Sequence, residues 1–291
     1  MDWFTRMNKA LDYIEGHLDD ELDINHAAKI ACSSPYHFQR MFHAIIGITP
    51  ADYIRRRRLT LAAMELASGN SKIIEIAAKY GYESPNAFTR AFKNMHGVVP
   101  SKARTSGTQL AAYHRLSFKV EIKGGNELNY RIVEKPAFEI VGKSQQFNYD
   151  EFIKNGPKFW KEYVGSDEYT SLWDLNKGKC GQITEAPLLS VYFPSETENR
   201  NAFIDVLGVE KHAKTNPQNF EIYPVPAATY AEFYCTYNTS MKTNKYIYGE
   251  WFSSTGYERD GYKPDIAAYF PVAFRPLKEM GIRWWIPVIK K

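Results

Sequence analysis

The feature that most constrains this chain is an internal repeat within its first hundred residues. Residues 24–50 and 74–100 align without a gap at an offset of 50, with eleven identical pairs among 27 positions. The identities fall on residues that punctuate secondary structure, such as Pro35 with Pro85. A repeat of this kind indicates two copies of one supersecondary unit in this part of the chain.

Each copy is typical of two helices joined by a tight turn. Residues 24–31 place small and apolar side chains at helical spacing, and a serine-proline pair follows. A serine before a proline predicts a helix start, because its hydroxyl accepts a free backbone N–H. Gly47, after the second helix, suits a left-handed cap. A longer helix over residues 51–68 and an N-terminal helix over residues 3–17 complete an all-α double helix-turn-helix domain.

The second helix of each copy carries a polar outer face that could contact DNA bases. Gln, Asn and Arg can form paired hydrogen bonds with base edges, and Thr or aromatic carbons can contact thymine methyl groups. A helical bundle with solvated polar faces would look similar, but here the pattern occurs twice with arginine at the same place. The predicted DNA contacts are Tyr36, His37, Gln39 and Arg40 in the first copy and Asn86, Thr89, Arg90 and Lys93 in the second. If the structure showed these faces packed inward or aimed in opposite directions, the case for DNA reading would collapse.

The charge pattern adds a set of arginines at residues 55–58. Successive helical residues point about 100° apart, so the four side chains cannot serve one phosphate. We expect one or two of them to pair with carboxylates or to stack, and others, including Arg55, to contact backbone phosphates. The net charge of +4 permits nucleic-acid binding but does not require it.

Residues 5–105 resemble the DNA-binding domain of the AraC/XylS family of bacterial transcription regulators. The signature stretch is IIEIAAKYGYESPNAFTRAFKNMHGVVPSKAR, residues 73–104. The resemblance implies that both helix-turn-helix units enter successive major grooves of double-stranded DNA and that RNA polymerase is a partner. Because one chain holds two unlike recognition helices, we expect a monomer on an asymmetric site of about 20 base pairs.

The composition changes after residue 108. We expect a DNA-binding domain at 1–108, a linker with a short strand-like piece at 109–125, and a second domain at 126–291. Residues 130–143 and 220–233 match weakly at an offset of 90, and each copy indicates a strand, a Pro-Ala turn and a second strand. Helix candidates follow at 149–165 and 241–256, and further strands at 188–194, 266–271 and 282–289. This pattern predicts an α+β domain of two related halves, with an antiparallel sheet and helices on one side.

The order of these motifs resembles the GyrI-like effector-binding domain, in the arrangement with an AraC-type domain that Rob-like regulators have. The motifs include Gly-x-Trp-Phe at residues 249–252 and Trp-Ile-Pro-Val at residues 285–288. The resemblance implies a groove lined by aromatic residues that binds a small-molecule effector. The candidate ligand contacts are Trp160, Tyr192, Glu232, Trp251, Tyr269, Arg283 and Trp285. For each aromatic residue among them, packing in the core is an equally good explanation.

The chain departs from this family at its acidic positions, where Ala267 and Arg283 replace the usual glutamates. A buried carboxylate selects a cation, because an unpaired buried charge is costly. We therefore expect a neutral or anionic amphipathic ligand held near Arg283. Glu232 and Glu139 remain as alternative anchors for a cation, because the alternation of the strands does not tell which way they face.

The missing motifs narrow the function further. The sequence has no GxSxG, HExxH, P-loop or GxGxxG pattern, so we expect no enzyme activity and no cofactor. Three cysteines without CxxC spacing argue against a metal site and fit a reducing cytoplasm. Neither a long apolar run nor a signal-peptide core is present, so we expect no membrane partner.

These observations predict a cytoplasmic, sequence-specific transcription regulator, acting as an activator and controlled by a small amphipathic ligand. The alternative that stays open is a GyrI-like domain that sequesters or hydrolyses its ligand and is fused to a DNA-binding module.

Overall fold

The computed structural model describes residues 3–69, 71–118, 129–194, 202–217, 219–261, 263–271 and 279–290. The chain forms two compact units, one of residues 1–32 with 46–121 and the other of residues 33–45 with 122–291. The predicted first recognition helix therefore packs in the same unit as the C-terminal domain, although the sequence places it in the helical repeat.

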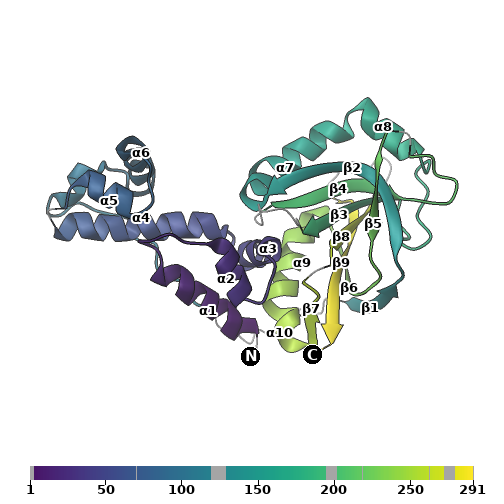
Figure 1. Cartoon of the computed structure of the whole chain (residues 1–291), viewed down its shortest axis with the longest axis horizontal. Helices are drawn as coiled ribbons and strands as arrows, with labels where there is room; N and C mark the ends of the chain where they lie inside the picture. Colours follow the sequence, from purple (N-terminus) through teal and green to yellow (C-terminus); the bar gives the residue numbers. More distant parts are fainter. Residues whose placement is uncertain are drawn as a thin grey trace. The chain divides into compact units, whose positions relative to one another are not determined.

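The first unit is helical (Figure 1). Its core lies between Leu59 and Leu66 of the long central helix and Phe88 and Phe92 of the helix at 85–96. The elements of the unit are α1 (Trp3–Gly16), α2 (Ile24–Ile30), α4 (Pro50–Ser68), α5 (Ile73–Lys79), α6 (Pro85–His96) and the 3₁₀ turn η1 (Pro100–Arg104). The predicted N-terminal and connecting helices are confirmed within one residue at each end.

The turn between α5 and α6 confirms the predicted helix signals. The Ser84 hydroxyl accepts a hydrogen bond from the Ala87 N–H at 3.2 Å, and Pro85 is the first helical residue. Gly97 ends α6 with a φ of 75°, a conformation that glycine adopts without the steric cost that other residues have.

Residues 109–118, predicted as linker, run extended along the helical unit. The Tyr113 N–H donates to the Thr60 hydroxyl at 2.9 Å, and the Leu116 N–H donates to the Tyr53 hydroxyl at 3.1 Å. No strand forms in residues 106–118. The remaining predicted linker residues, 119–125, lie outside the described part of the chain.

The second unit combines the remaining helices with an antiparallel sheet. It includes residues 35–45 of α3 (Pro35–Ile46). The first half of its α+β domain contains β1 (Tyr130–Lys135), β2 (Phe138–Asn148), α7 (Tyr149–Val164), α8 (Asp167–Asp174), β3 (Leu188–Pro194) and β4 (Ala202–Glu210). Its second half contains β5 (Glu221–Val225), β6 (Ala228–Thr236), the turn η2 (Tyr237–Thr239), α9 (Ser240–Tyr246), the π-helical turn η3 (Ile247–Trp251), α10 (Phe252–Ser254), β7 (Tyr257–Arg259), β8 (Asp265–Phe270) and β9 (Gly281–Lys290).

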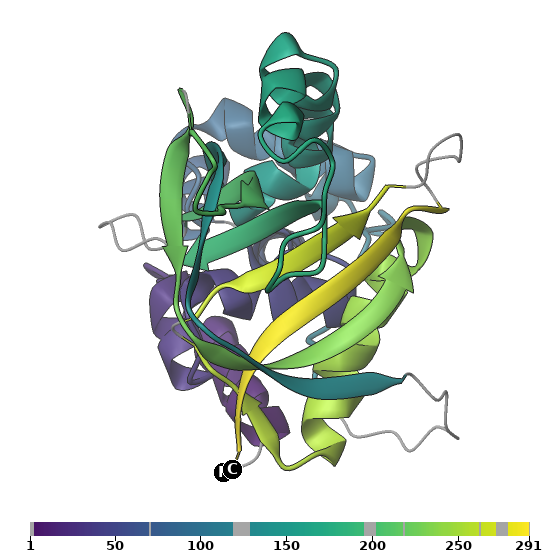
Figure 2. The same cartoon turned by 90° about the vertical axis from the view of Figure 1, so that its right-hand side faces the viewer.

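The sheet confirms the prediction of two related halves. In the described residues the strand order is β1-β6-β9-β8-β3-β4-β2-β5, and β7 pairs with β9 (Figure 2). In chain order, β1, β2, β3 and β4 of the first half correspond to β5, β6, β8 and β9 of the second. If each strand is replaced by its counterpart, the strand order is the same read from the opposite end. The two halves therefore meet at the β3–β8 pair, where Tyr192 lies opposite Asp265.

The two faces of the sheet have different neighbours. One face carries an apolar core that includes Leu189, Val191, Tyr230, Ile266 and Trp285, and the long strand β2 bends around the sheet (Figure 1). The other face carries α7, α8 and α9, as in the bonds from Trp160 to Asp205 and from Trp284 to Ser240. This second face is called the helix face below.

Candidate DNA-binding and effector-binding sites

The polar face of α6 is open. Asn86, Arg90 and Lys93 are exposed and Thr89 is half-buried, while Phe88 and Phe92 on the opposite side are fully buried. This arrangement leaves the amide and guanidinium groups free to contact base edges.

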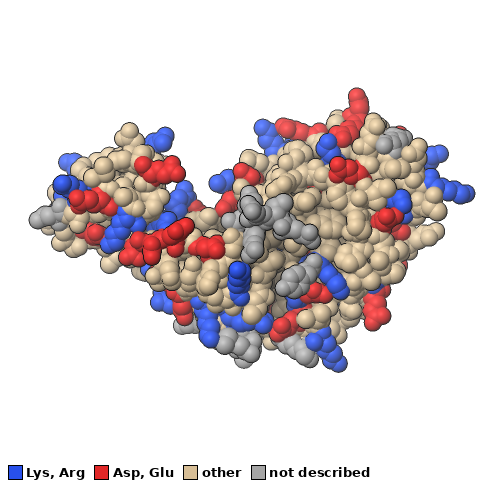
Figure 3. Space-filling model, in the orientation of Figure 1, with Lys and Arg blue, Asp and Glu red and all other residues tan. Residues whose placement is uncertain are grey.

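The arginines of α4 divide into structural and exposed members. Arg57 forms a paired contact with Glu15, and Arg58 donates to the Leu18 carbonyl at 2.8 Å. Arg56 bonds Asp52 at 2.7 Å, whereas Arg55 also pairs with Asp52 but keeps more than half of its side chain exposed. Arg55 is therefore the member of this run best placed for a phosphate. On the visible face of the helical unit, positive and negative side chains are interspersed (Figure 3).

The polar face of α3 differs from that of α6 because it is buried. The exposed fractions of Tyr36, His37, Gln39 and Arg40 are between 0 and 6%. Three of these side chains contact the C-terminal part of the second unit, and Gln39 donates to the Pro35 carbonyl of its own helix at 3.3 Å. The first predicted DNA-contacting face thus points inward in this structure.

Arg40 is the centre of this contact. Its guanidinium donates to Asp265 Oδ2 at 2.6 Å and to Asn244 Oδ1 at 2.9 Å. Its central carbon lies 4.4 Å from the ring centroid of Trp284, and Tyr192 and Tyr248 lie within 6 Å. We call these five residues, Asp265, Asn244, Tyr192, Tyr248 and Trp284, the Arg40 site. They combine a carboxylate with aromatic rings, which together favour a flat cation.

Asp265 is fully buried and forms ion pairs with two arginines. Arg259 of β7 donates to Oδ1 at 2.8 Å, and Arg40 takes Oδ2. Burial alone would raise the pKa of Asp265, but Arg259, His37 and Arg40 together hold it well below its ordinary value. The carboxylate is therefore ionised and has a charged partner on each oxygen.

Aromatic side chains extend the contact to the other half of the domain. The ring centroid of Tyr36 lies 4.3 Å from that of Phe203 in β4 and 6.0 Å from that of Tyr149 in α7. The Tyr149 hydroxyl lies 3.4 Å from His43 Nδ1. α3 therefore touches both halves of the domain where they meet.

A second buried carboxylate, Asp205, lies on the same face beside Tyr192, with which it pairs across β3 and β4. It accepts hydrogen bonds from Trp160 Nε1 and Ser190 Oγ, each at 2.7 Å. Burial raises the pKa of Asp205 to about 7, although these two bonds and the charge of Arg40 act in the opposite direction. Trp160, Tyr192 and Tyr269, three of the predicted ligand residues, lie around this acid or across the neighbouring strands.

The other predicted ligand residues lie elsewhere. Trp285 donates to Glu232 at 3.0 Å, and Arg283 pairs with Glu232 and Glu185. Glu232, Arg283 and Trp285 alternate with Trp284 along the paired strands β6 and β9, so they belong to the opposite face of the sheet. Trp251 is buried against Phe233 and Tyr257. Glu139 is exposed and pairs with Lys211.

Although Ala267 replaces the usual glutamate, the helix face of the domain holds a buried carboxylate, Asp265. Asp265 lies two residues before Ala267 and therefore points to the same face of the sheet. Asp205 lies in the middle of the largely apolar strand Ala202–Glu210, and Asp265 begins the largely apolar strand Asp265–Phe270. An acid within or at the start of an apolar strand is the sequence signal that could have identified both residues.

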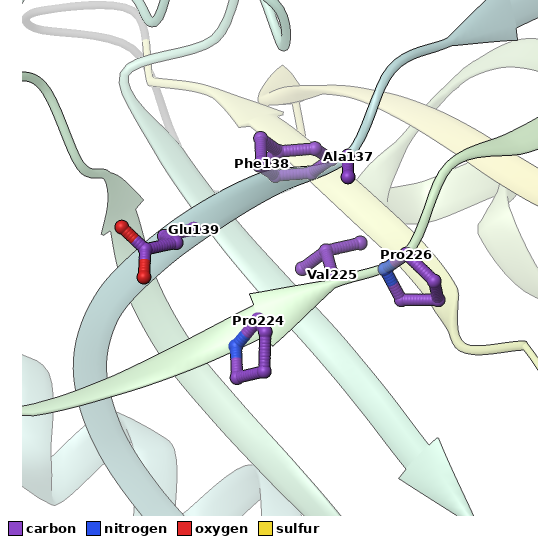
Figure 4. Close-up of a pocket in the computed structure, with 6 residues that line it drawn as sticks. All are labelled: Ala137, Phe138, Glu139, Pro224, Val225 and Pro226. Carbon is purple, nitrogen blue, oxygen red and sulfur yellow. The ribbon is translucent and has the colours of Figure 1, made fainter.

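A hollow of about 350 Å³ lies at another part of the domain (Figure 4). It is lined by Ala137, Phe138, Glu139, Pro224, Val225 and Pro226. These residues come from β2, β5 and the two Pro-Ala turns of the repeat, and none belongs to the Arg40 site. The hollow has almost no polar group that could orient a ligand, so it is a weaker candidate than the helix face.

The two helix pairs and the two-half α+β domain define a DNA-binding transcription regulator with an effector-binding domain. Residues 27–106 match a family model described as a helix-turn-helix domain, and residues 131–288 match one described as an integron-associated effector binding protein. The described residues contain no helix that is both long and apolar enough to cross a membrane.

Two relatives show how far these similarities extend. YbfP of Bacillus subtilis, an uncharacterized HTH-type transcriptional regulator, is 38% identical over 71% of this chain and 79% of its own length. The multiple antibiotic resistance protein MarA of Escherichia coli is 36% identical over 35% of this chain and 81% of its own length. The structure of SAV2435 bound to tetraphenylphosphonium is similar over 56% of this chain and 94% of its own, at 13% identity and with a TM-score of 0.46. The chain belongs to the AraC family of transcription regulators, with a GyrI-like effector-binding domain.

The burial of His37 predicts a loss of stability in mild acid. Burial and the nearby Arg259 lower the pKa of His37 to about 3, although Asp265 acts in the opposite direction. Because this value lies below the ordinary 6.5, the stabilising contribution is complete above pH 6.5 and is lost as the pH falls toward 3. Between pH 6.5 and 5, His37 should account for up to about 2 kcal/mol of lost unfolding free energy.

Chemical denaturation at a series of pH values measures this contribution. The His37→Gln variant, which keeps a polar side chain but does not titrate, should lose less stability than the wild type across this range. Parallel profiles for the two proteins would show that His37 is not held neutral in the folded state.

Proposed function

We propose that this regulator activates transcription from the cytoplasm, as a monomer bound to an asymmetric DNA site of about 20 base pairs. The observation that supports DNA reading most directly is the exposed polar face of α6, beside a capped and well-packed helix-turn-helix core. In this proposal α3 and α6 occupy successive major grooves, Arg55 contacts a phosphate, and the bound protein contacts RNA polymerase.

The C-terminal domain is proposed as a sensor rather than an enzyme. The two buried acids of the helix face are already bonded, Asp265 to two arginines and Asp205 to Trp160 and Ser190. A general base must lie within hydrogen-bond reach of the substrate proton, whereas these two acids hold structural side chains of the domain.

The effector is proposed to be an aromatic molecule with one positive charge, bound at the helix face. Asp205 and Asp265 are both fully buried there, next to Tyr192 and Trp284. The carboxylate of Asp265 and the ring of Trp284 already hold the guanidinium of Arg40, which is a flat cation. Once Arg40 has left, this combination of carboxylate and aromatic rings favours a cation over the anion expected from the sequence.

Replacing Arg90 tests the DNA contact. Arg90→Ala removes an exposed guanidinium that can form two hydrogen bonds with a guanine. Binding to a cognate fragment should weaken by about 1–3 kcal/mol, and discrimination at one base pair should relax. Fluorescence anisotropy with a DNA fragment selected from a random-sequence pool measures both effects.

Lys154→Ala is the matched control, because it removes an equal charge from an exposed position on α7. It should leave sequence discrimination unchanged. Equal sequence preference in wild type and Arg90→Ala would show that α6 does not read bases.

A pair of ions with the same shape and opposite charge tests the effector class. Tetraphenylphosphonium should bind at least about tenfold more tightly than tetraphenylborate, because the carboxylate and the aromatic rings of the Arg40 site interact favourably with a cation and not with an anion. Isothermal titration of the full chain gives both affinities. Arg283→Ala should not change the ratio, since Arg283 is paired on the opposite face. A preference for the borate that Arg283→Ala abolishes would instead support an anionic ligand at Arg283.

A further inference from the structure

We propose that α3 competes with the effector for the helix face of the C-terminal domain, which the polar face of α3 occupies in this structure. While α3 is docked there, the effector cannot bind at the Arg40 site and α3 cannot contact DNA. This inference rests on the proposed function and adds to it the way in which the ligand controls the DNA-binding helix.

Arg40 has the chemistry proposed for the effector. Its guanidinium is a flat monocation held by the Asp265 carboxylate and covered by the ring of Trp284. Asn244 accepts a further hydrogen bond from it, while the Asn244 amide nitrogen donates to the Ser240 carbonyl. Trp284 is itself fixed by a bond from its Nε1 to the Ser240 hydroxyl at 3.0 Å. The Arg40 site is thus pre-oriented by contacts that do not involve α3.

The position of α3 also fits a ligand site rather than a core element. It lies where the two halves of the domain meet, against Tyr192 of β3, Asp265 of β8 and the helices α7 and α9. The apolar core of the sheet lies on the opposite face and includes no residue of α3. The domain therefore keeps its main core when α3 is withdrawn.

The electrostatics allow α3 to leave. Asp265 retains Arg259 as a partner after Arg40 is removed, so its charge is not left alone. Its Oδ2 atom, however, loses its shortest contact, and the aromatic rings lose the cation between them. A free cation with aromatic groups restores both interactions, which gives the effector a higher affinity for the state with α3 withdrawn.

The docked state cannot use α3 on DNA. The hydrogen-bonding atoms of His37 and Arg40 that would contact bases are occupied by Ser34, Asp265 and Asn244. The observed operator affinity of the whole chain then equals its intrinsic affinity multiplied by the fraction of molecules in which α3 is withdrawn. Because linkage is reciprocal, effector and operator DNA must strengthen each other's binding by the same factor.

A variant far from the DNA-contacting residues tests the competition without any ligand. Asn244→Ala removes one acceptor from the Arg40 guanidinium and leaves both helix-turn-helix units intact. The full-length variant should bind the selected DNA fragment at least about tenfold more tightly than the wild type, as expected from losing one hydrogen bond to a charged group in the docked state. Met241→Ala on the same helix is the control, since Met241 is exposed, and it should leave the affinity unchanged.

The second arm measures tetraphenylphosphonium binding by isothermal titration. Arg40→Ala should bind this cation about tenfold more tightly than the wild type, because the competing guanidinium is gone. Arg90→Ala, the counterpart at the offset of 50, should bind it as the wild type does. A weaker or unchanged affinity in Arg40→Ala would overturn the proposal, and if no chain binds this cation the operator arm decides alone.

The failures of the two proposals are distinguishable. If the wild type selects no DNA sequence from the pool, the proposed function fails and the competition falls with it. If it selects a sequence but Asn244→Ala binds that sequence no more tightly, the competition fails and the DNA-binding function stands.

Discussion

The docking of α3 depends on one buried carboxylate, Asp265, which is shared by Arg40 and Arg259. Removing one partner of a buried ion pair commonly costs about 3–5 kcal/mol, because the remaining charge is left without compensation. Here the second arginine reduces that penalty, since the carboxylate keeps one cation whichever state α3 adopts. The ion pair between Arg40 and Asp265 can therefore break and form again at a lower cost than a buried ion pair with a single cation.

The site is asymmetric although the domain that bears it is built from related halves. Asp265 occupies the strand position that corresponds to Leu188, and Asp205 the position that corresponds to Ile282. Both acids lie near the β3–β8 pair, while the corresponding positions of the other half are apolar. The two related halves therefore differ in polarity on the helix face. A single helix can then dock with its arginine directed toward β8 and its tyrosine toward β4, as Arg40 and Tyr36 do.

The sequence predicted the local elements well because their signals are local. The offset of 50 identified both helix pairs, and Ser84, Pro85 and Gly97 act as the caps that their residue types indicate. The offset of 90 identified the two halves of the C-terminal domain, but the strand β4 and helix α8 were not predicted. The contact of Arg40 with Asp265 joins residues 225 positions apart, and no periodicity carries that information. The face to which Glu232 or Trp285 points also depends on strand register, which no local pattern in the sequence gives.

The two copies of the repeat show what docking requires of α3. Both carry arginine at the same position, Arg40 and Arg90, as DNA reading would require of each. They differ at the neighbouring positions, where α3 has Tyr36 and His37 and α6 has Asn86 and Ala87. Tyr36 packs on Phe203, and the neutral His37 ring lies 3.3 Å from Asp265.

Neither contact could be made by an alanine or by the shorter asparagine side chain. The arginine shared by both copies suits a base edge or a carboxylate, whereas the tyrosine and histidine suit a largely apolar protein surface. The first recognition helix therefore combines residues for two partners on one face. Because Arg40 cannot bond a base and Asp265 at once, these two interactions compete for the same guanidinium.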